Sequence, residues 1–265
     1  MTSLLLEEDA AIPETEVQSN ALTEDSGWLV FRYLPVTLFS LKMSRATSTA
    51  GKTLLIPTPY AVKMAVVDAA LRHGLVADPE DLVRALGKVG LRIGVPVQAC
   101  TTGTIQSVRQ ETRDVERKRS PKLPWYRSTI AMREFVHYQG ELRLAFGLES
   151  CMPDLIAVLI AAAPAINYLG KRGSFFQYLG CARQPDLDAT FTKPSDDTER
   201  DVAAAGQRAT LDDFGSGACF EALNSFSPTE IRWGVHRRFV ETIVPLHLYN
   251  TGPGFAHYCV AGAIL

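Results

Sequence analysis

The sequence lacks the features that mark membrane and secreted proteins. No apolar run reaches the roughly 18 residues that a membrane-spanning helix needs. The closest, residues 155–166, is shorter and contains Pro164, so we expect a buried helix there. The N-terminus carries Leu4-Leu5-Leu6 without a basic flank, and acidic residues follow at once, unlike a signal peptide. We therefore expect no contact with a membrane.

Cysteine and histidine are scarce and scattered. The five cysteines include no Cys-x-x-Cys pair, which argues against a disulfide framework or a zinc site and favours a reducing cytoplasm. The five histidines show no spacing typical of metal ligands. The sequence shows no cluster of carboxylates of the kind that would indicate metal-dependent hydrolysis. We expect neither a metal nor a cofactor.

Charge is distributed unevenly along the chain. Residues 1–27 hold seven acidic residues and no Lys or Arg, so the net charge of −2 conceals an excess of five positive charges in the remainder. Residues 107–133 alone carry eight Lys or Arg against three acids. Local positive charge of this kind is the footprint expected for binding a polyanion, although a solvated face is the usual reading of a charge run. The aromatics and prolines within the run favour the polyanion.

The pattern of hydrophobic residues predicts an α+β fold, a ferredoxin-like or RRM-type sandwich. We expect an acidic flexible tail at 1–26 and a single domain at 27–265, with a protruding thumb insertion at 98–128 and an irregular acidic excursion at 185–229. The expected strands are 28–41, 91–98, 129–138, 141–148, 174–179, 237–249 and 255–264. The expected helices are 60–73 and 79–88, with Thr58 and Asp78 as N-caps, and 153–166.

Residues 44–64, SRATSTAGKTLLIPTPYAVKM, allow two interpretations. Four of them fit a relaxed P-loop: Ala46, Gly51, Lys52 and Thr53. A P-loop needs a helix that begins at its Lys-Thr pair and points its N-terminus at the phosphates. Pro57 and Pro59 delay the helix by about six residues, because each disfavours helical geometry in the residue before it. A basic, hydroxyl-rich loop that faces an RNA backbone is therefore favoured over a nucleotide hydrolase.

Three basic clusters are candidates for contact with RNA, because Lys and Arg hold phosphates and aromatic faces stack on unpaired bases. The first cluster is Lys42, Ser44, Arg45, Lys52, Thr53 and Lys63. The second is Arg109, Arg113, Arg117, Lys118, Arg119, Lys122, Trp125, Tyr126 and Arg127. The third is Lys171-Arg172, in a turn bounded by Gly170 and Gly173.

Each assignment has an alternative. Trp125 and Tyr126 could instead anchor the insertion against the body of the protein, and Lys63 could be an ordinary solvated helix residue. A catalytic role would need a His, Tyr or Lys near a 2′-hydroxyl. His137, Tyr138 and Lys171 are the candidates for such a trio.

Four segments resemble the CRISPR-associated RAMP superfamily, specifically family five, the subunit that caps the guide-RNA 5′ handle in type I Cascade complexes. Residues 28–64 are similar to that family's first strand, polar loop, Pro-bearing turn and first helix. Residues 98–133 take the place of its basic thumb, a protruding β-hairpin, and STIAMREFVHYQGELRLAF (128–146) is similar to the strand pair after it. Residues 168–172, YLGKR, resemble its Leu-Gly-basic turn.

The resemblance implies a body that grips the crRNA 5′ handle and a thumb that folds over the guide where it meets a neighbouring subunit. The implied partners are the crRNA, the backbone and large subunits of a Cascade-like complex and, indirectly, target DNA. Most of the family binds without catalysis, and this chain lacks an obvious signature of the branch that cleaves RNA. We predict a cytoplasmic, non-catalytic RNA-binding subunit; the alternative is a metal-independent endoribonuclease that processes CRISPR repeat RNA.

Overall fold

The computed structural model describes residues 26–43, 50–120, 122–195 and 206–262. Helices and sheets are mixed along the chain, which confirms the α+β class. The strands are β1 Trp28–Pro35, β2 Ala50–Gly51, β3 Leu91–Gly94, β4 Gln98–Glu111, β5 Tyr126–Gln139, β6 Leu142–Gly147, β7 Phe176–Gln184, β8 Lys193–Pro194, β9 Gln207–Phe214, β10 Arg237–Val244, β11 His247–Gly252 and β12 Phe255–Cys259. The helices are α1 Pro59–Arg72, α2 Pro79–Lys88, α3 Asp114–Arg119, α4 Pro153–Ala162 and α6 Phe220–Leu223, with 3-10 turns at η1 Leu148–Ser150 and η2 Ala163–Ala165.

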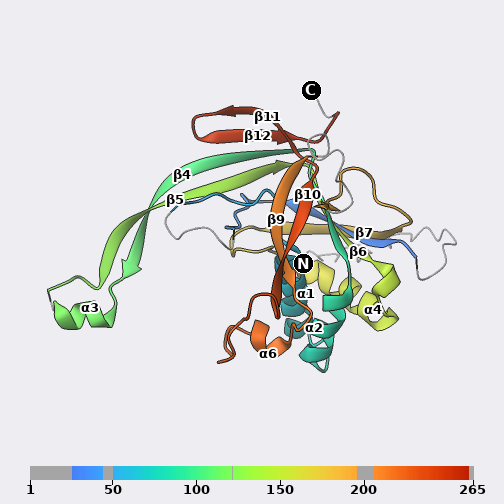
Figure 1. The fold of residues 1–265 in the computed structure, drawn as a ribbon, viewed down its shortest axis with the longest axis horizontal. Coiled ribbons are helices and arrows are strands. Elements are labelled where there is room, and N and C mark those ends of the chain that lie inside the picture. Colours follow the sequence, from blue (N-terminus) through green and yellow to red (C-terminus); the bar gives the residue numbers. More distant parts are fainter. Residues whose placement is uncertain (1–25, 44–49, 121, 196–205, 263–265) are drawn as a thin grey trace, which may run out of the picture.

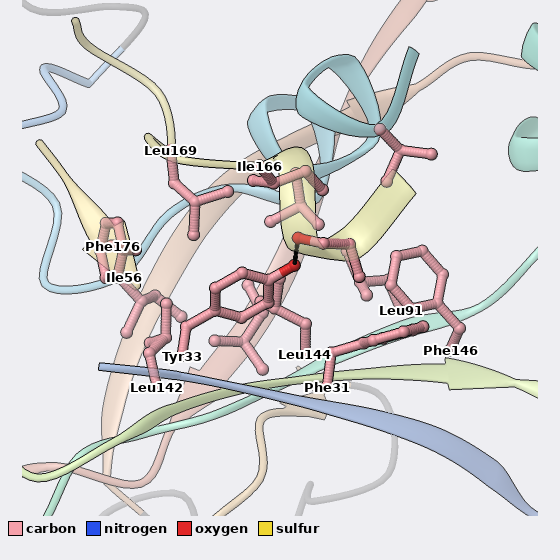
Figure 2. Packing of buried hydrophobic residues seen from close by; sticks show 14 of the residues in the cluster. Phe31, Tyr33, Ile56, Leu91, Leu142, Leu144, Phe146, Ile166, Leu169 and Phe176 are labelled. Carbon is pink, nitrogen blue, oxygen red and sulfur yellow. Dashed lines mark hydrogen bonds between the residues drawn. The ribbon is translucent and has the colours of Figure 1, made fainter. Parts of the chain in front are cut away.

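The main core lies between a four-stranded sheet, in the order β3-β6-β1-β7, and the helices α1, α2 and α4. All neighbouring strands in this sheet are antiparallel. Alternate residues of β1 point toward the helices, because side chains of a strand alternate between its faces. Among them, Phe31 and Tyr33 are almost completely buried (Figure 2). The Tyr33 hydroxyl donates a 2.9 Å hydrogen bond to the carbonyl of Ala163, which ties the sheet to the end of α4.

Helices α1 and α2 begin where the sequence predicts. The Thr58 side chain accepts a hydrogen bond from the amide of Ala61 at 3.1 Å, and the Asp78 side chain accepts one from Glu80 at 2.8 Å. Each helix has a proline in its first turn, where no backbone donor is missed. The start of α1 at Pro59 confirms that no helix begins at Lys52-Thr53. Within the described ranges, no helix is long and apolar enough to cross a membrane.

A second, five-stranded sheet has the order β11-β12-β4-β5-β2. Strands β4 and β5 form one continuous hairpin, paired from Gln98↔Gln139 out to Glu111↔Tyr126, with α3 at its tip. The hairpin extends away from the body (Figure 1). The two strands that we expected at 129–138 and 141–148 are present, but they are not partners. Strand β5 pairs with β4, whereas β6 crosses into the four-stranded sheet and pairs with β1 and β3.

The predicted irregular excursion at 185–229 is only partly irregular. Strand β9 pairs with β10 along its whole length. Two of the acids that suggested a solvated stretch are held inside by cations: Asp212 pairs with Arg237, and Asp213 lies 2.8 Å from Lys63. The segment between β7 and β8 covers the face of the four-stranded sheet that points away from the helices. There Phe191 packs against Val30 and Ala145.

The C-terminal part also differs from expectation. The single strand expected at 237–249 divides at Pro245 into β10 and β11, which belong to different sheets. Strand β11 then returns through β12 onto the base of β4. The last two strands therefore widen the sheet from which the hairpin projects (Figure 1).

Candidate nucleic-acid interface

The basic loop is fastened to the base of the hairpin. Strand β2 runs parallel to β5, with Gly51 opposite Arg133. The amide of Thr53 donates a 2.8 Å hydrogen bond to the carboxylate of Glu134. An antiparallel bridge between Lys42 and Thr53 closes the loop on its other side. These contacts place the second end of the loop against β5 and the first end, at Lys42, against the second.

The Thr53 hydroxyl does not face outward. Thr53 is buried, and its Oγ1 accepts a 3.0 Å hydrogen bond from the amide of Leu41 and donates one of 3.0 Å to the carbonyl of Leu54. This residue therefore holds the loop together. Lys52, next to it, is exposed. Ser44 and Arg45 lie outside the described residues.

The turn with Lys171 and Arg172 packs on the chain that leads into the loop. The Thr37 hydroxyl donates to the carbonyl of Gly173 at 2.7 Å and accepts from the amide of Phe175 at 2.7 Å. The amide of Ser40 donates to Ser174 Oγ at 3.1 Å. Gly170 has a φ of +73°, and a Cβ there would lie 3.0 Å from a methyl group of Leu41. Glycine therefore permits both the backbone conformation and the close approach.

Lys42, Arg133 and Lys171, from three separate segments, lie near one another at the base of the hairpin, and Lys52 and Arg172 are next to Gly51 and Lys171 in the sequence. We define the basal basic cluster as Lys42, Lys52, Arg133, Lys171 and Arg172. The Lys42 side chain lies across Gly51, and Gly51 pairs with Arg133. The pKa of Lys171 is lowered, first by partial burial and second by the nearby charge of Arg133. Cations held this close together favour an anion between them.

Arg133 belongs to the charged run at 107–133 but is not among the residues predicted to contact RNA. The alternation of side chains along β5 shows which face Arg133 occupies. It shares one face with Ala131 and Phe135, while Glu134 and Val136 face the body. A partner for β5 had to be known before this alternation could place Arg133 beside the loop.

A methyl group at Gly51 tests the role of Lys42. In Gly51→Ala the new Cβ would lie 2.9–3.1 Å from the Lys42 side chain, which is flexible enough to move away. We expect unchanged thermal unfolding and about a threefold loss of affinity for single-stranded RNA, because one cation leaves the cluster. Fluorescence anisotropy measures this change. The same substitution at Gly87, where a Cβ meets nothing within 4 Å, is the control.

The second predicted cluster lies at the far end of the hairpin. Its exposed cations are Arg109, Arg113, Lys118, Arg119, Lys122 and Arg127, of which Arg127 pairs with Glu116 at 2.5 Å. The side chain of Arg117 is not described. Trp125 and Tyr126 are 63% and 61% exposed, so neither is packed into the body of the protein as the anchoring alternative requires. The structure therefore separates this hairpin-tip cluster from the basal basic cluster by the length of the hairpin.

Lys63 does not belong to either cluster. It is 0% exposed, on the inner side of α1, and its ammonium group lies 2.8 Å from Asp213. The prediction of a phosphate contact at Lys63 does not fit this position, and neither does the alternative of a solvated helix residue. Lys63 was assigned to the first cluster because it is close to the loop in the sequence. Its actual partner, Asp213 of β9, is distant in the sequence and could not be predicted from it.

The three residues considered for catalysis are not brought together. His137 and Tyr138 are consecutive in β5 and point to opposite faces. Tyr138 is buried, and its hydroxyl donates a 2.6 Å hydrogen bond to the carbonyl of Leu55. Burial raises the pKa of Tyr138 well above its usual value. Tyr138 therefore secures the chain before α1 and is unsuited to act as a base.

Comparison with known proteins agrees with the resemblance seen in the sequence. No protein-family model matches the chain. Over 147 residues, the chain is 25% identical to the CRISPR-associated protein Cas5 of Archaeoglobus fulgidus. The matched region covers 55% of this chain and 59% of that protein, less than two thirds of its length. This likeness confirms the resemblance to CRISPR-associated proteins of family five.

Solved structures show weaker likeness. A crystal structure of a CRISPR protein from Archaeoglobus fulgidus aligns with a TM-score of 0.38 and 10% identity, over 89% of this chain and 92% of that one. A CRISPR RNA-guided surveillance complex contains a chain that aligns with a TM-score of 0.45 and 15% identity, over 83% and 91%. Both TM-scores lie below 0.5.

Proposed function

We propose that the chain is a non-catalytic RNA-binding subunit of a CRISPR type I, Cascade-like effector complex, which holds the 5′ handle of the crRNA and contacts the adjacent backbone subunit. The observation that carries the proposal is the basal basic cluster. Three segments far apart in the sequence bring Lys42, Arg133 and Lys171 near one another. Lys52 and Arg172 follow Gly51 and Lys171 directly in the chain. The similarity to Cas5 supports a role in such a complex.

The four-stranded sheet supports a ferredoxin-like body. Its strands follow the chain order strand, helices, strand, strand, helix, strand, in β1, β3, β6 and β7. The spatial order β3-β6-β1-β7 places the first and third of these strands in the centre. This order is the one expected for a split βαβ unit, and it supports a body of the ferredoxin-like or RRM type. We propose that the five-stranded sheet and its hairpin are the thumb and its base.

The hairpin suits contact with another protein as well as with RNA. Fourteen-residue strands have a contour length of about 45 Å. Directly paired residues share a face, so Ile105 and Met132 lie together, with Ile130 two residues farther along the same face. Their exposures are 69%, 58% and 69%. An exposed apolar strip of this kind marks a protein interaction surface and supports docking on a neighbouring subunit.

Charge reversal at the hairpin tip tests the thumb assignment. In a Lys118→Glu/Arg119→Glu variant we expect at least a tenfold loss of guide RNA retained by the assembled complex, since two phosphate contacts become repulsions. The measurement is quantification of RNA copurified with the tagged subunit. Glu substitution of two α2 cations, Arg84 and Lys88, changes the net charge equally and serves as control. Unchanged RNA retention in the tip variant would refute the assignment.

Incubation with repeat RNA in EDTA tests the absence of catalysis. Because His137, Tyr138 and Lys171 are not assembled, we expect the purified protein to leave a repeat hairpin intact. Cleavage products under these conditions would favour the endoribonuclease alternative.

A further inference from the structure

The five-stranded sheet has one face that no described helix covers at the base of the hairpin. Directly paired residues in adjacent strands project to the same side. One row of such pairs across β12, β4 and β5 is Phe255, Thr102 and Phe135. The next row is His257, Cys100 and His137. We call this side, defined by these two rows, the outer face of the sheet.

The outer face presents rings to solvent. Phe255 is 40% exposed, and His137 is exposed as well. Tyr249 of β11, 58% exposed, stands edge-on to His257 with ring centroids 5.4 Å apart and an interplanar angle of 81°. The Gln98 side chain holds His257 through a 2.9 Å hydrogen bond to Nε2. Rings thus lie on the adjacent strands β11 and β12 and, across β4, on β5. RRM domains likewise stack unpaired bases on aromatic side chains of an open sheet.

The charges of this face suit a polyanion. Strands β4, β5, β11 and β12 contain two acidic residues, Glu111 and Glu134. The pairing register places both on the opposite face, and Glu134 is engaged there by the Thr53 amide. The side chain of Arg133 lies on the outer face, two residues before Phe135 and four before His137. The outer face is therefore continuous with the basal basic cluster.

The outer face and the opposite face of the hairpin differ in chemistry, and the difference indicates which one suits a nucleic acid and which one suits a protein. The contiguous apolar side chains Ile105, Ile130 and Met132 lie on the other face of the hairpin. On the outer face, polar Thr102 and Cys100 separate the rings, so no unbroken apolar patch is available to a protein. Flat rings with polar neighbours and no carboxylate fit nucleic-acid bases better.

We propose that the outer face is a stacking platform for unpaired bases of single-stranded RNA, whose phosphates continue into the basal basic cluster. The rings of Phe255, Phe135, His137 and Tyr249 contact base faces, while Arg133 and Lys171 hold the neighbouring phosphates. This assignment depends on the proposed function of the basal basic cluster, and it adds the site that receives the bases.

Removing bases while keeping phosphates tests the platform. A fluorescent single-stranded RNA is compared with a strand of equal length whose bases are replaced by abasic sugars, using the full chain and the His137→Ala/Phe255→Ala variant. The wild type is expected to bind the normal strand about tenfold more tightly than the abasic strand, because stacking contributes at each ring. The variant keeps Phe135 and Tyr249, so its preference for the normal strand is expected to fall to about threefold or less. The matched control is Phe226→Ala, which removes a 96% exposed ring outside this sheet.

The outcomes separate the platform from the phosphate cluster. A variant that keeps the full, about tenfold, preference of the wild type for the normal strand overturns the platform, even when RNA binding itself is intact. Equal, weak binding of both strands by the wild type overturns it too. The Lys171→Glu variant tests the phosphate cluster separately, and its loss of binding to both strands supports the proposed function. The platform is then tested by whether the wild type prefers the normal strand.

Two further readouts guard against misfolded variants and wrong ligands. Photocrosslinking of a 4-thiouridine strand to the wild type is expected to label peptides from β5 or β12, and labelling confined to other peptides contradicts the proposal. A DNA strand of the same sequence is expected to bind more weakly than RNA; equal or tighter binding of DNA would overturn the assignment to RNA.

Discussion

Replacing Lys171 and Arg133 with Glu is expected to lower the affinity for single-stranded RNA by about 100-fold. Each cation makes a charge-assisted contact of about 1.5 kcal/mol with phosphate in our account, and two such contacts amount to about 3 kcal/mol. The two side chains are close enough for the charge of Arg133 to lower the pKa of Lys171. They should therefore act on the same stretch of backbone.

Salt dependence separates this effect from a general loss of charge. For single strands, each neutralised phosphate contributes about 0.7 to the slope of log affinity against log salt, so the double variant should lose about 1.4. The control replaces Arg84 and Lys88 of α2 with Glu, for the same change of net charge. Equal losses of affinity in both variants would mean that the basal basic cluster has no special role.

Lys63→Met is expected to reduce the free energy of unfolding by about 3 kcal/mol. The Lys63 side chain is 1% exposed and that of Asp213 13%, and their charged atoms are 2.8 Å apart. Removing one partner of a buried ion pair leaves the other charge without compensation, which typically costs about 3–5 kcal/mol. We place the effect near the lower end because Arg238 lies 3.9 Å from the second oxygen of Asp213.

Chemical denaturation measures this loss, with Lys88→Met, an exposed lysine of α2, as the control. RNA affinity per folded molecule should be unchanged, since Lys63 lies inside the protein. A loss of stability below about 1 kcal/mol, or a selective loss of RNA binding, would contradict the assignment of Lys63 to the ion pair that joins α1 to β9.

Local chemistry made the helix starts predictable. Thr58 and Asp78 cap α1 and α2 because a side-chain oxygen reaches an amide two or three residues ahead, a contact that depends on nearby sequence alone. The same reasoning excluded a helix at Lys52-Thr53. Composition likewise located β1, which is rich in aromatic and β-branched residues, and α4, which lies within a long apolar run.

Long-range pairing was not predictable in the same way. The hairpin strands carry exposed Ile105, Ile130 and Met132, so no alternation of buried residues identified their outer half. Asp212 and Asp213 suggested a solvated segment, because their cationic partners come from elsewhere in the chain. The position of Arg133 beside the loop follows from the pairing of β5 with β2, which the sequence does not predict. In each case the deciding contact joins segments that are distant in sequence.

The most direct test of the central claim is to sequence the RNA that copurifies with the tagged chain when it is expressed with its neighbouring genes and a CRISPR array. We expect guide RNAs that share one repeat-derived 5′ end, protected from nuclease in the wild type and lost in the Lys171→Glu/Arg133→Glu variant. Recovery of no RNA, or of RNA without a common 5′ end, would contradict a subunit that holds the crRNA handle.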